Sequence, residues 1–251
     1  MVYSLGNLPD SEKLQNLLAF ENDRQKLLKN RTMVRKALLK CMKENGFKQK
    51  GRSTFYTINN DIIGYFVFEH PSNRTYINFC IYPTYMPPME MIHLMFSKRI
   101  SKVISDSDMD FSDYVSEEQL YALCQKLDGY ITERILPFIN KINTKEKMKK
   151  ELKCKERFLN TSIVATSIEF KYKIKMYTEL SLHAYSDAMN AANTFLALSD
   201  CTTSTELVRS SVRMEYQKFM DLANKKDDAY IDQIIGKWKT NNIEFFTGKH
   251  P

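Results

Sequence analysis

The chain has little glycine and little histidine, which removes several common kinds of active site. Its seven glycines are scattered over 251 residues and form neither a phosphate-binding loop nor a dinucleotide-binding loop. The four histidines never stand four residues apart, so the H-E-x-x-H pair of zinc peptidases is absent. The nucleophile motif G-x-S-x-G is also absent. We therefore expect no catalytic, metal-binding or cofactor-binding residues, and we favour a protein that is not an enzyme.

Cysteine is also sparse, and no segment is both long and apolar. The five cysteines lie at least 30 residues apart and their number is odd, which fits neither a disulfide framework nor a zinc site. No apolar run approaches the roughly 18 to 20 residues that span a bilayer. The opening segment, MVYSLGNLPDSEKLQN, lacks the charged and apolar regions of a secretory signal. We therefore expect a cytoplasmic protein with free thiols and no membrane partner.

Positive charge is abundant and unevenly placed. The formal net charge is +7, and the stretch from Arg24 to Arg52 alone holds eleven Lys or Arg and one acid. Helical spacing places four lysines on one face of a predicted N-terminal helix, and a basic link follows that helix. The residues of this basic surface are Lys29, Lys36, Lys40, Lys43, Lys48, Lys50 and Arg52. Such a surface attracts phosphate groups or an acidic partner, although a lysine-rich helix face also serves solubility alone.

The first 115 residues predict a helix followed by a small antiparallel sheet. Residues 11–45 have helical periodicity with an expected break near residues 30–32, and Gly46 is suited to end the helix in a left-handed conformation. Lys48 to Arg52 are expected to form a short exposed link. Aromatic and β-branched residues then predict strands at 53–58, 62–70 and 75–83, a fourth within 91–100 and a short one near DFSDYV, residues 110–115.

From Ser116 onward the pattern is helical. Ser116 and Gln119 match a capping box, which predicts a helix start. A strongly charged helix is expected over residues 144–159. Residues 168–176 alternate as a strand would, but a longer spacing of three and four over residues 163–199 favours helix.

These elements predict an α+β protein. An N-terminal helix packs on a small antiparallel sheet, and a C-terminal, bundle-like group of helices follows. The expected division is an α+β head domain at residues 1–141 and a helical domain or extension at residues 142–251.

Residues 34–101 resemble a bacterial family known only as domain of unknown function 4304. The resemblance lies in the order of a helix, GFKQKG, an aromatic pair, and the segments IIGYFVF, YINFCIYP and HLMFSKRIS. The residues that carry it are Gly46, Phe47, Lys48, Gly51, Phe55, Tyr56, Arg99 and Ile100. The tryptophan-rich strand that is usual in the family is replaced by DMDFSDYV. The resemblance implies an α+β fold and no particular activity.

Two surfaces are candidates for binding: the basic surface, and the side of the sheet that carries Tyr56, Tyr76 and Tyr82. Exposed rings on a sheet can stack on bases, unless another element such as the C-terminal helices covers them. The favoured hypothesis is a non-enzymatic intracellular binding or accessory protein with an unidentified protein partner.

Two alternatives stay open. A nucleic-acid-binding protein would use the basic surface and would need it to be continuous with exposed tyrosines. An enzyme of unrecognised type would need a polar pocket in which carboxylates or histidines converge.

Overall fold

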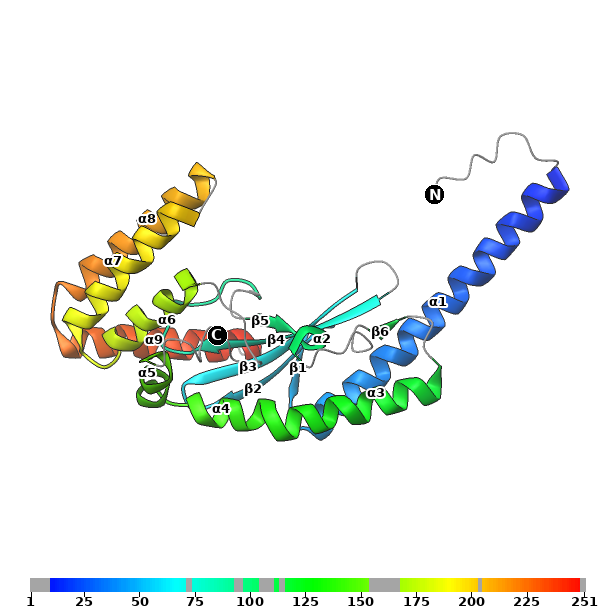
Figure 1. The fold of residues 1–251 in the computed structure, drawn as a ribbon, viewed down its shortest axis with the longest axis horizontal. Coiled ribbons are helices and arrows are strands. Elements are labelled where there is room, and N and C mark those ends of the chain that lie inside the picture. Colours follow the sequence, from blue (N-terminus) through cyan, green and yellow to red (C-terminus); the bar gives the residue numbers. More distant parts are fainter. Residues whose placement is uncertain are drawn as a thin grey trace.

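A computed structural model describes residues 10–70, 74–92, 97–103, 111–112, 116–153, 168–202 and 205–248. The molecule has the predicted α+β architecture, in which an antiparallel sheet is covered by helices and a helical hairpin projects from one end (Figure 1). Among the described helices, none combines the length and the apolar character that crossing a bilayer requires.

The first helix, α1 (Asp10–Glu44), is continuous, so the break expected near residues 30–32 is wrong. It ends as predicted at Gly46, whose φ of 78° lies in the left-handed region. The Gly46 amide donates to the Lys43 carbonyl and the Phe47 amide donates to the Met42 carbonyl, each at 3.0 Å. These two bonds form a Schellman motif, which satisfies carbonyls that the helix itself leaves without partners.

The expected link after this helix is instead a strand, β1 (Lys48–Lys50), paired antiparallel with β2 (Thr54–Asn59). The sheet continues through β3 (Ile62–Glu69) and β4 (Arg74–Pro83) to β5 (Ser97–Arg99), which lies within the fourth predicted strand. The predicted short strand is β6 (Phe111–Ser112), which pairs with β4. The short helix α2 (Ile100–Val103) follows β5. Every pair among the described strands is antiparallel.

One face of the sheet packs against the end of α1 and against a second run of helix. This run consists of α3 (Glu117–Tyr130), the π-helical turn η2 (Ile131–Ile135) and α4 (Leu136–Ile142), and its start has the predicted Ser116–Gln119 capping box. Phe47 contacts Phe66 edge to face, with ring centroids 5.1 Å apart. A Cβ atom built on Gly64 would lie 2.6 Å from Cδ1 of Ile139, so the absence of a side chain at Gly64 lets α4 approach the sheet closely.

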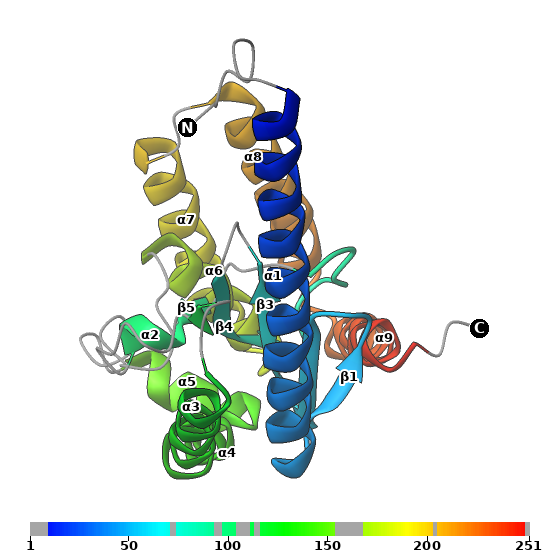
Figure 2. The same ribbon diagram turned by 90° about the vertical axis from the view of Figure 1, so that its right-hand side faces the viewer.

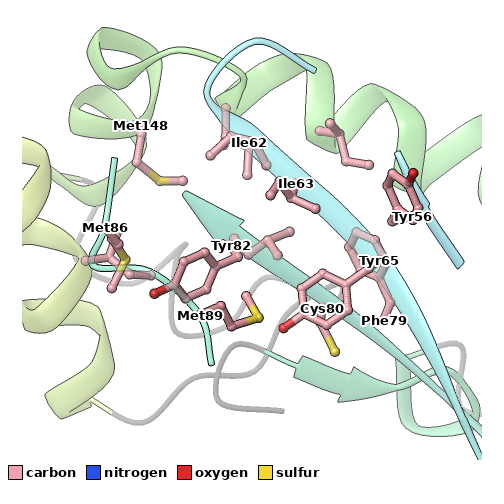
Figure 3. Packing of buried hydrophobic residues seen from close by; sticks show 14 of the residues in the cluster. Tyr56, Ile62, Ile63, Tyr65, Phe79, Cys80, Tyr82, Met86, Met89 and Met148 are labelled. Carbon is pink, nitrogen blue, oxygen red and sulfur yellow. The ribbon is translucent and has the colours of Figure 1, made fainter. Parts of the chain in front are cut away.

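The opposite face of the sheet is covered by the last helix, α9 (Asp228–Thr247), so the C-terminus returns to the N-terminal sheet. The Phe246 ring lies against Tyr56 and Tyr65, with centroids 5.3 and 5.2 Å away. Figure 3 shows these two tyrosines on the sheet, with Tyr82 and the methionines at 86 and 89 gathered nearby. A single buried cluster runs from α1 through the sheet to α9, and the predicted domain boundary at residue 141 falls inside α4.

The remaining helices are α5 (Lys145–Lys153), α6 (Ile168–Leu180), α7 (Tyr185–Thr202) and α8 (Glu206–Ala223). The alternating run at residues 168–176 is helical, as the longer period predicted. The single helical pattern expected over residues 163–199 is nevertheless interrupted at 181–184, where His183 has a φ of 56°. The interruption turns the chain back, and α7 and α8 project as a hairpin from the end of the molecule opposite to the free half of α1 (Figures 1 and 2).

Two exposed glycines respond in opposite directions to the same change. Gly46→Ala should lower the free energy of unfolding by about 1 kcal/mol, because its positive φ disfavours any residue with a Cβ atom. Gly236→Ala should raise it by a similar amount, about 1 kcal/mol, because this position is inside α9 and has no heavy atom within 4 Å of an added Cβ. Urea unfolding of both variants measures the pair, and equal signs would contradict the helix end described at Gly46.

Candidate functional site

The predicted basic surface includes a fully exposed helix face. Lys29, Lys36, Lys40 and Lys43 are exposed on α1, and the Lys40 ammonium lies 3.8 Å from the Glu44 carboxylate. Buried residues, among them Val34 and Leu38, occupy the side of the helix that packs on the body. The lysine face is therefore available to solvent, and it contributes nothing to the core.

The rest of the basic surface belongs to β1 and to the turn after it. Lys48 and Arg52 are exposed, and the Arg52 carbonyl accepts a hydrogen bond of 3.2 Å from Arg35. Lys50 differs, because its ammonium lies 4.0 Å from the centroid of the Phe245 ring in α9 and burial lowers its pKa. Lys50 thus joins the edge strand to α9 through a cation–π contact and does not extend the exposed surface.

The predicted tyrosine side of the sheet is covered. Tyr56 lies under Phe246, and burial raises its pKa. Tyr82 is buried and donates a hydrogen bond of 2.7 Å to the Pro87 carbonyl. Tyr76 is partly buried, with the Arg99 guanidinium 3.7 Å from its ring centroid. The structure therefore separates the three tyrosines from one another and does not bring them together with the exposed lysines as one open platform.

A hollow of about 400 Å³ lies instead between α6, α8 and α9, where no binding surface was predicted. Its floor is aromatic, since Tyr177 contacts both Phe219 and Trp238 edge to face, with centroids 5.3 and 5.7 Å away. The other lining residues are Pro87, Ser211, Met214, Glu215, Lys218 and Leu222. We call this hollow the α8–α9 pocket.

The one carboxylate in the α8–α9 pocket, Glu215, is already engaged. Lys173 places its ammonium 2.6 Å from one carboxylate oxygen, and the Tyr177 hydroxyl donates to the other at 3.2 Å. Burial and then the Glu215 charge raise the pKa of Tyr177 well above its ordinary value, so this hydroxyl stays protonated. The negative charge of Glu215 is therefore balanced by Lys173, and the hydrogen bond from Tyr177 helps to hold the carboxylate in place.

A second hollow, of about 450 Å³, lies beside the first and shares Lys218, Leu222 and Trp238 with it. Its rim carries three lysines, Lys218, Lys225 and Lys237, and one acid, Asp221. The Lys225 ammonium lies 4.0 Å from the centroid of Tyr230. The seam between α8 and α9 thus has an aromatic floor and a rim of positive charge.

Exposed apolar residues also lie on α8, between the tip of the hairpin and the α8–α9 pocket. The exposed fraction is 81% for Leu207 and 59% for Met214, which are two helical turns apart and so lie on the same side of the helix. Phe219 and Ala223 are buried on another side of α8. The helix therefore carries two apolar sides, of which one builds the body and the other, the α8 strip of Leu207 and Met214, faces solvent.

The wall of the pocket at Pro87 is fixed by a buried side chain from α9. The Asn242 amide oxygen accepts from the Met89 amide at 2.9 Å, and its amide nitrogen donates to the carbonyls of Thr84 and Met86 at 3.0 and 2.9 Å. Lys239, also in α9, lies 2.7 Å from the Asp61 carboxylate. The Asn242 bonds set the turn after β4 against α9, and the Lys239–Asp61 pair ties the turn between β2 and β3 to the same helix.

A third hollow, of about 580 Å³, lies between α1 and α3 and contains Cys41 and Cys124. Burial raises the pKa of Cys41 to about 12 and that of Cys124 to about 11, so both thiols are protonated at neutral pH and poorly nucleophilic. Within the described ranges, no group of three or more His, Cys, Asp or Glu side chains is arranged to hold a metal ion.

The sequence contained a partial signal for the α8–α9 pocket. Leu207 and Met214 fall on a side of α8 about 120° from its core-facing residues, which a search for a second apolar stripe can detect. The partners of that stripe, Tyr177 from α6 and Pro87 from the turn after β4, come from distant parts of the chain, and periodicity says nothing about them.

Comparisons with family models, with curated protein sequences and with solved structures return no match for this chain. The resemblance of residues 34–101 to domain of unknown function 4304 stays a prediction.

Replacing Asn242 tests the anchor that positions the pocket wall. Asn242→Ala should lower the free energy of unfolding by about 3 kcal/mol, because it leaves one buried amide and two buried carbonyls without this partner. The neighbouring and exposed Asn241 provides the control, and Asn241→Ala should change stability by less than about 0.5 kcal/mol. Urea unfolding measures both variants, and similar effects of the two changes would contradict the anchoring role.

Proposed function

We propose that this protein is a non-enzymatic intracellular binding protein whose α8 strip and α8–α9 pocket hold an apolar segment of an acidic partner protein. The observation that carries the proposal is that Met214, 59% exposed, lines an aromatic pocket with Trp238, while Leu207, 81% exposed, lies two turns away on the same side of α8. Exposed apolar side chains beside an aromatic pocket are typical of protein-binding surfaces, where a few buried anchors supply most of the affinity.

The charge around the seam favours an acidic partner. Lys218, Lys225 and Lys237 outnumber Asp221 on the rim, and the carboxylate of Glu215 is balanced by Lys173. Opposite charges at the rim of an interface accelerate association and select among partners. An amphipathic helix with apolar residues on one side and acids on the other has the matching chemistry.

We favour binding over catalysis because the one carboxylate that lines the pocket is engaged and is not free to act as a general base. That carboxylate has partners on both oxygens, and the Tyr177 hydroxyl is kept protonated by its surroundings. The free thiols of Cys41, Cys80, Cys124 and Cys201, in the described part of the chain, support a reducing, cytoplasmic location.

Nucleic acid is the second candidate ligand, because four lysines on α1 are exposed on a single face. Against it, the tyrosines that would stack on bases are covered or partly buried. We therefore place nucleic acid second.

Trp238 is the only tryptophan in the chain, so its fluorescence reports binding at the pocket directly. The probes are two designed helical peptides with the same leucine face, one with glutamates and one with lysines on the polar face. We expect saturable binding of the glutamate peptide and much weaker binding of the lysine peptide. Met214→Glu should weaken binding by at least about tenfold, because it places a charge in the path to the pocket.

Met91 supplies the control, since its exposed fraction of 63% is close to the 59% of Met214 and it lines neither hollow of the α8–α9 seam. Met91→Glu should bind the glutamate peptide as the wild type does. Equal losses in the two variants, or no binding of the glutamate peptide, would contradict the proposal.

The nucleic-acid candidate is tested separately with single-stranded and duplex oligonucleotides at two salt concentrations. Replacing Lys36, Lys40 and Lys43 together by Ser should weaken binding uniformly across sequences and flatten its salt dependence if these lysines contact phosphates. Our proposal expects no binding at physiological salt, and binding that the triple replacement abolishes would favour nucleic acid.

A further inference from the structure

We infer that the projecting half of α1 is a homodimerisation helix that pairs antiparallel with the same segment of a second copy of this chain. The helix leaves the body of the molecule and extends well past it (Figure 1). Among the α1 side chains that the structure describes, those before Val34 are exposed or partly exposed, and Val34 is buried. The segment before it, residues 10–32, is about 34 Å long at the helical rise of roughly 1.5 Å per residue.

A helix without a partner is marginal in water, since most helical stability in proteins comes from packing an apolar side. The projecting segment displays such a side, because Leu17 and Leu18 are 53% and 57% exposed. It also carries asparagines at positions 16, 22 and 30, which lower intrinsic helix stability. We therefore expect this segment of α1 to pack against a partner.

The distribution of charge along the segment favours a second copy of the same segment as the packing partner. Residues 10–23 hold four acids and one base, a net charge of −3, whereas residues 24–35 hold five bases and no acid, a net charge of +5. A segment with opposite charges in its two halves is complementary to its own copy in antiparallel orientation. A parallel pair would place like charges together.

One register of the antiparallel helix pair brings leucine opposite leucine and also brings opposite charges together. With the two-fold axis between positions 22 and 23, position 17 of one copy faces position 28 of the other, and both are leucine. Glu21 faces position 24, an arginine, and Asp10 faces position 35, also an arginine. Such an arrangement is isologous, since each contact occurs twice about the axis, and it closes as a dimer.

The first test is sedimentation of the full chain over a wide range of concentration. The wild type should shift from monomer to dimer, and Leu17→Glu with Leu18→Glu should raise the dissociation constant at least about tenfold, because each copy then sets charged side chains in place of the leucines that face positions 28 and 27 of the other. Gln15→Glu with Ala19→Glu adds the same charge at exposed positions about 160° around the helix from Leu17, on the side away from position 28 of the partner, and should leave the dimer intact. All four residues are exposed, so thermal unfolding should remain cooperative in both variants.

The second test is rescue between two different chains. Glu21→Arg alone and Arg24→Glu alone should each be largely monomeric, because each places like charges opposite one another. Mixing the two variants should restore the dimer, since every facing pair then has opposite charges. A wild type that is monomeric throughout, a control variant as disruptive as the leucine variant, or a mixture that stays monomeric would each overturn the inference.

Discussion

The three hydrogen bonds of Asn242 are the contact on which the arrangement of the molecule depends. They tie the last helix to the turn that follows β4, 153 to 158 residues earlier in the chain. Because Trp238, Asn242 and Phe246 are spaced by four residues, they lie along one side of α9. Fixing Asn242 therefore fixes Phe246 over the sheet at one end and Trp238 in the α8–α9 pocket at the other. The hydrogen bonds of Asn242 therefore support both the core of the fold and the proposed binding site.

The anchoring of α9 by Asn242 explains why the N-terminal sheet and the C-terminal helices, which look like separate parts in the sequence, form a continuous core. The sheet and its first helical cover come from the N-terminal half, and α6 to α8 build a second group of helices. Alpha9 belongs to both, since it buries Ile231 and Ile235 at its start and contacts Tyr65 through Phe246 near its end. The projecting elements, α1 and the α7–α8 hairpin, then extend from opposite ends of one body (Figure 1).

Much of the local structure could be predicted because it depends on neighbouring residues. Gly46 ends α1 for a local reason, as does the capping box at Ser116, and the strands have clear aromatic and β-branched patterns. One error had a local cause, since α6 ends just before His183, which has a left-handed φ of 56°. The amides of His183 and Ala184 donate to the carbonyls of Leu180 and Glu179 as in the motif at Gly46, but without a glycine to signal it. The other errors came where contacts between distant segments decide the outcome. Lys48–Lys50 form a strand because β2 offers an edge and α9 receives Lys50. The pocket was missed for the same reason, since its lining residues come from α6, α8, α9 and a turn.

The most direct measurement is native-state hydrogen exchange of the full chain in low concentrations of denaturant. If α9 and the sheet are one cooperative unit, the slowest amides of α9 and those of β3 and β4 should open with the same free energy and the same dependence on denaturant. If instead the amides of α9 exchange together with α6 to α8 at a clearly lower free energy, while β3 and β4 stay protected, then α9 is not the support described here.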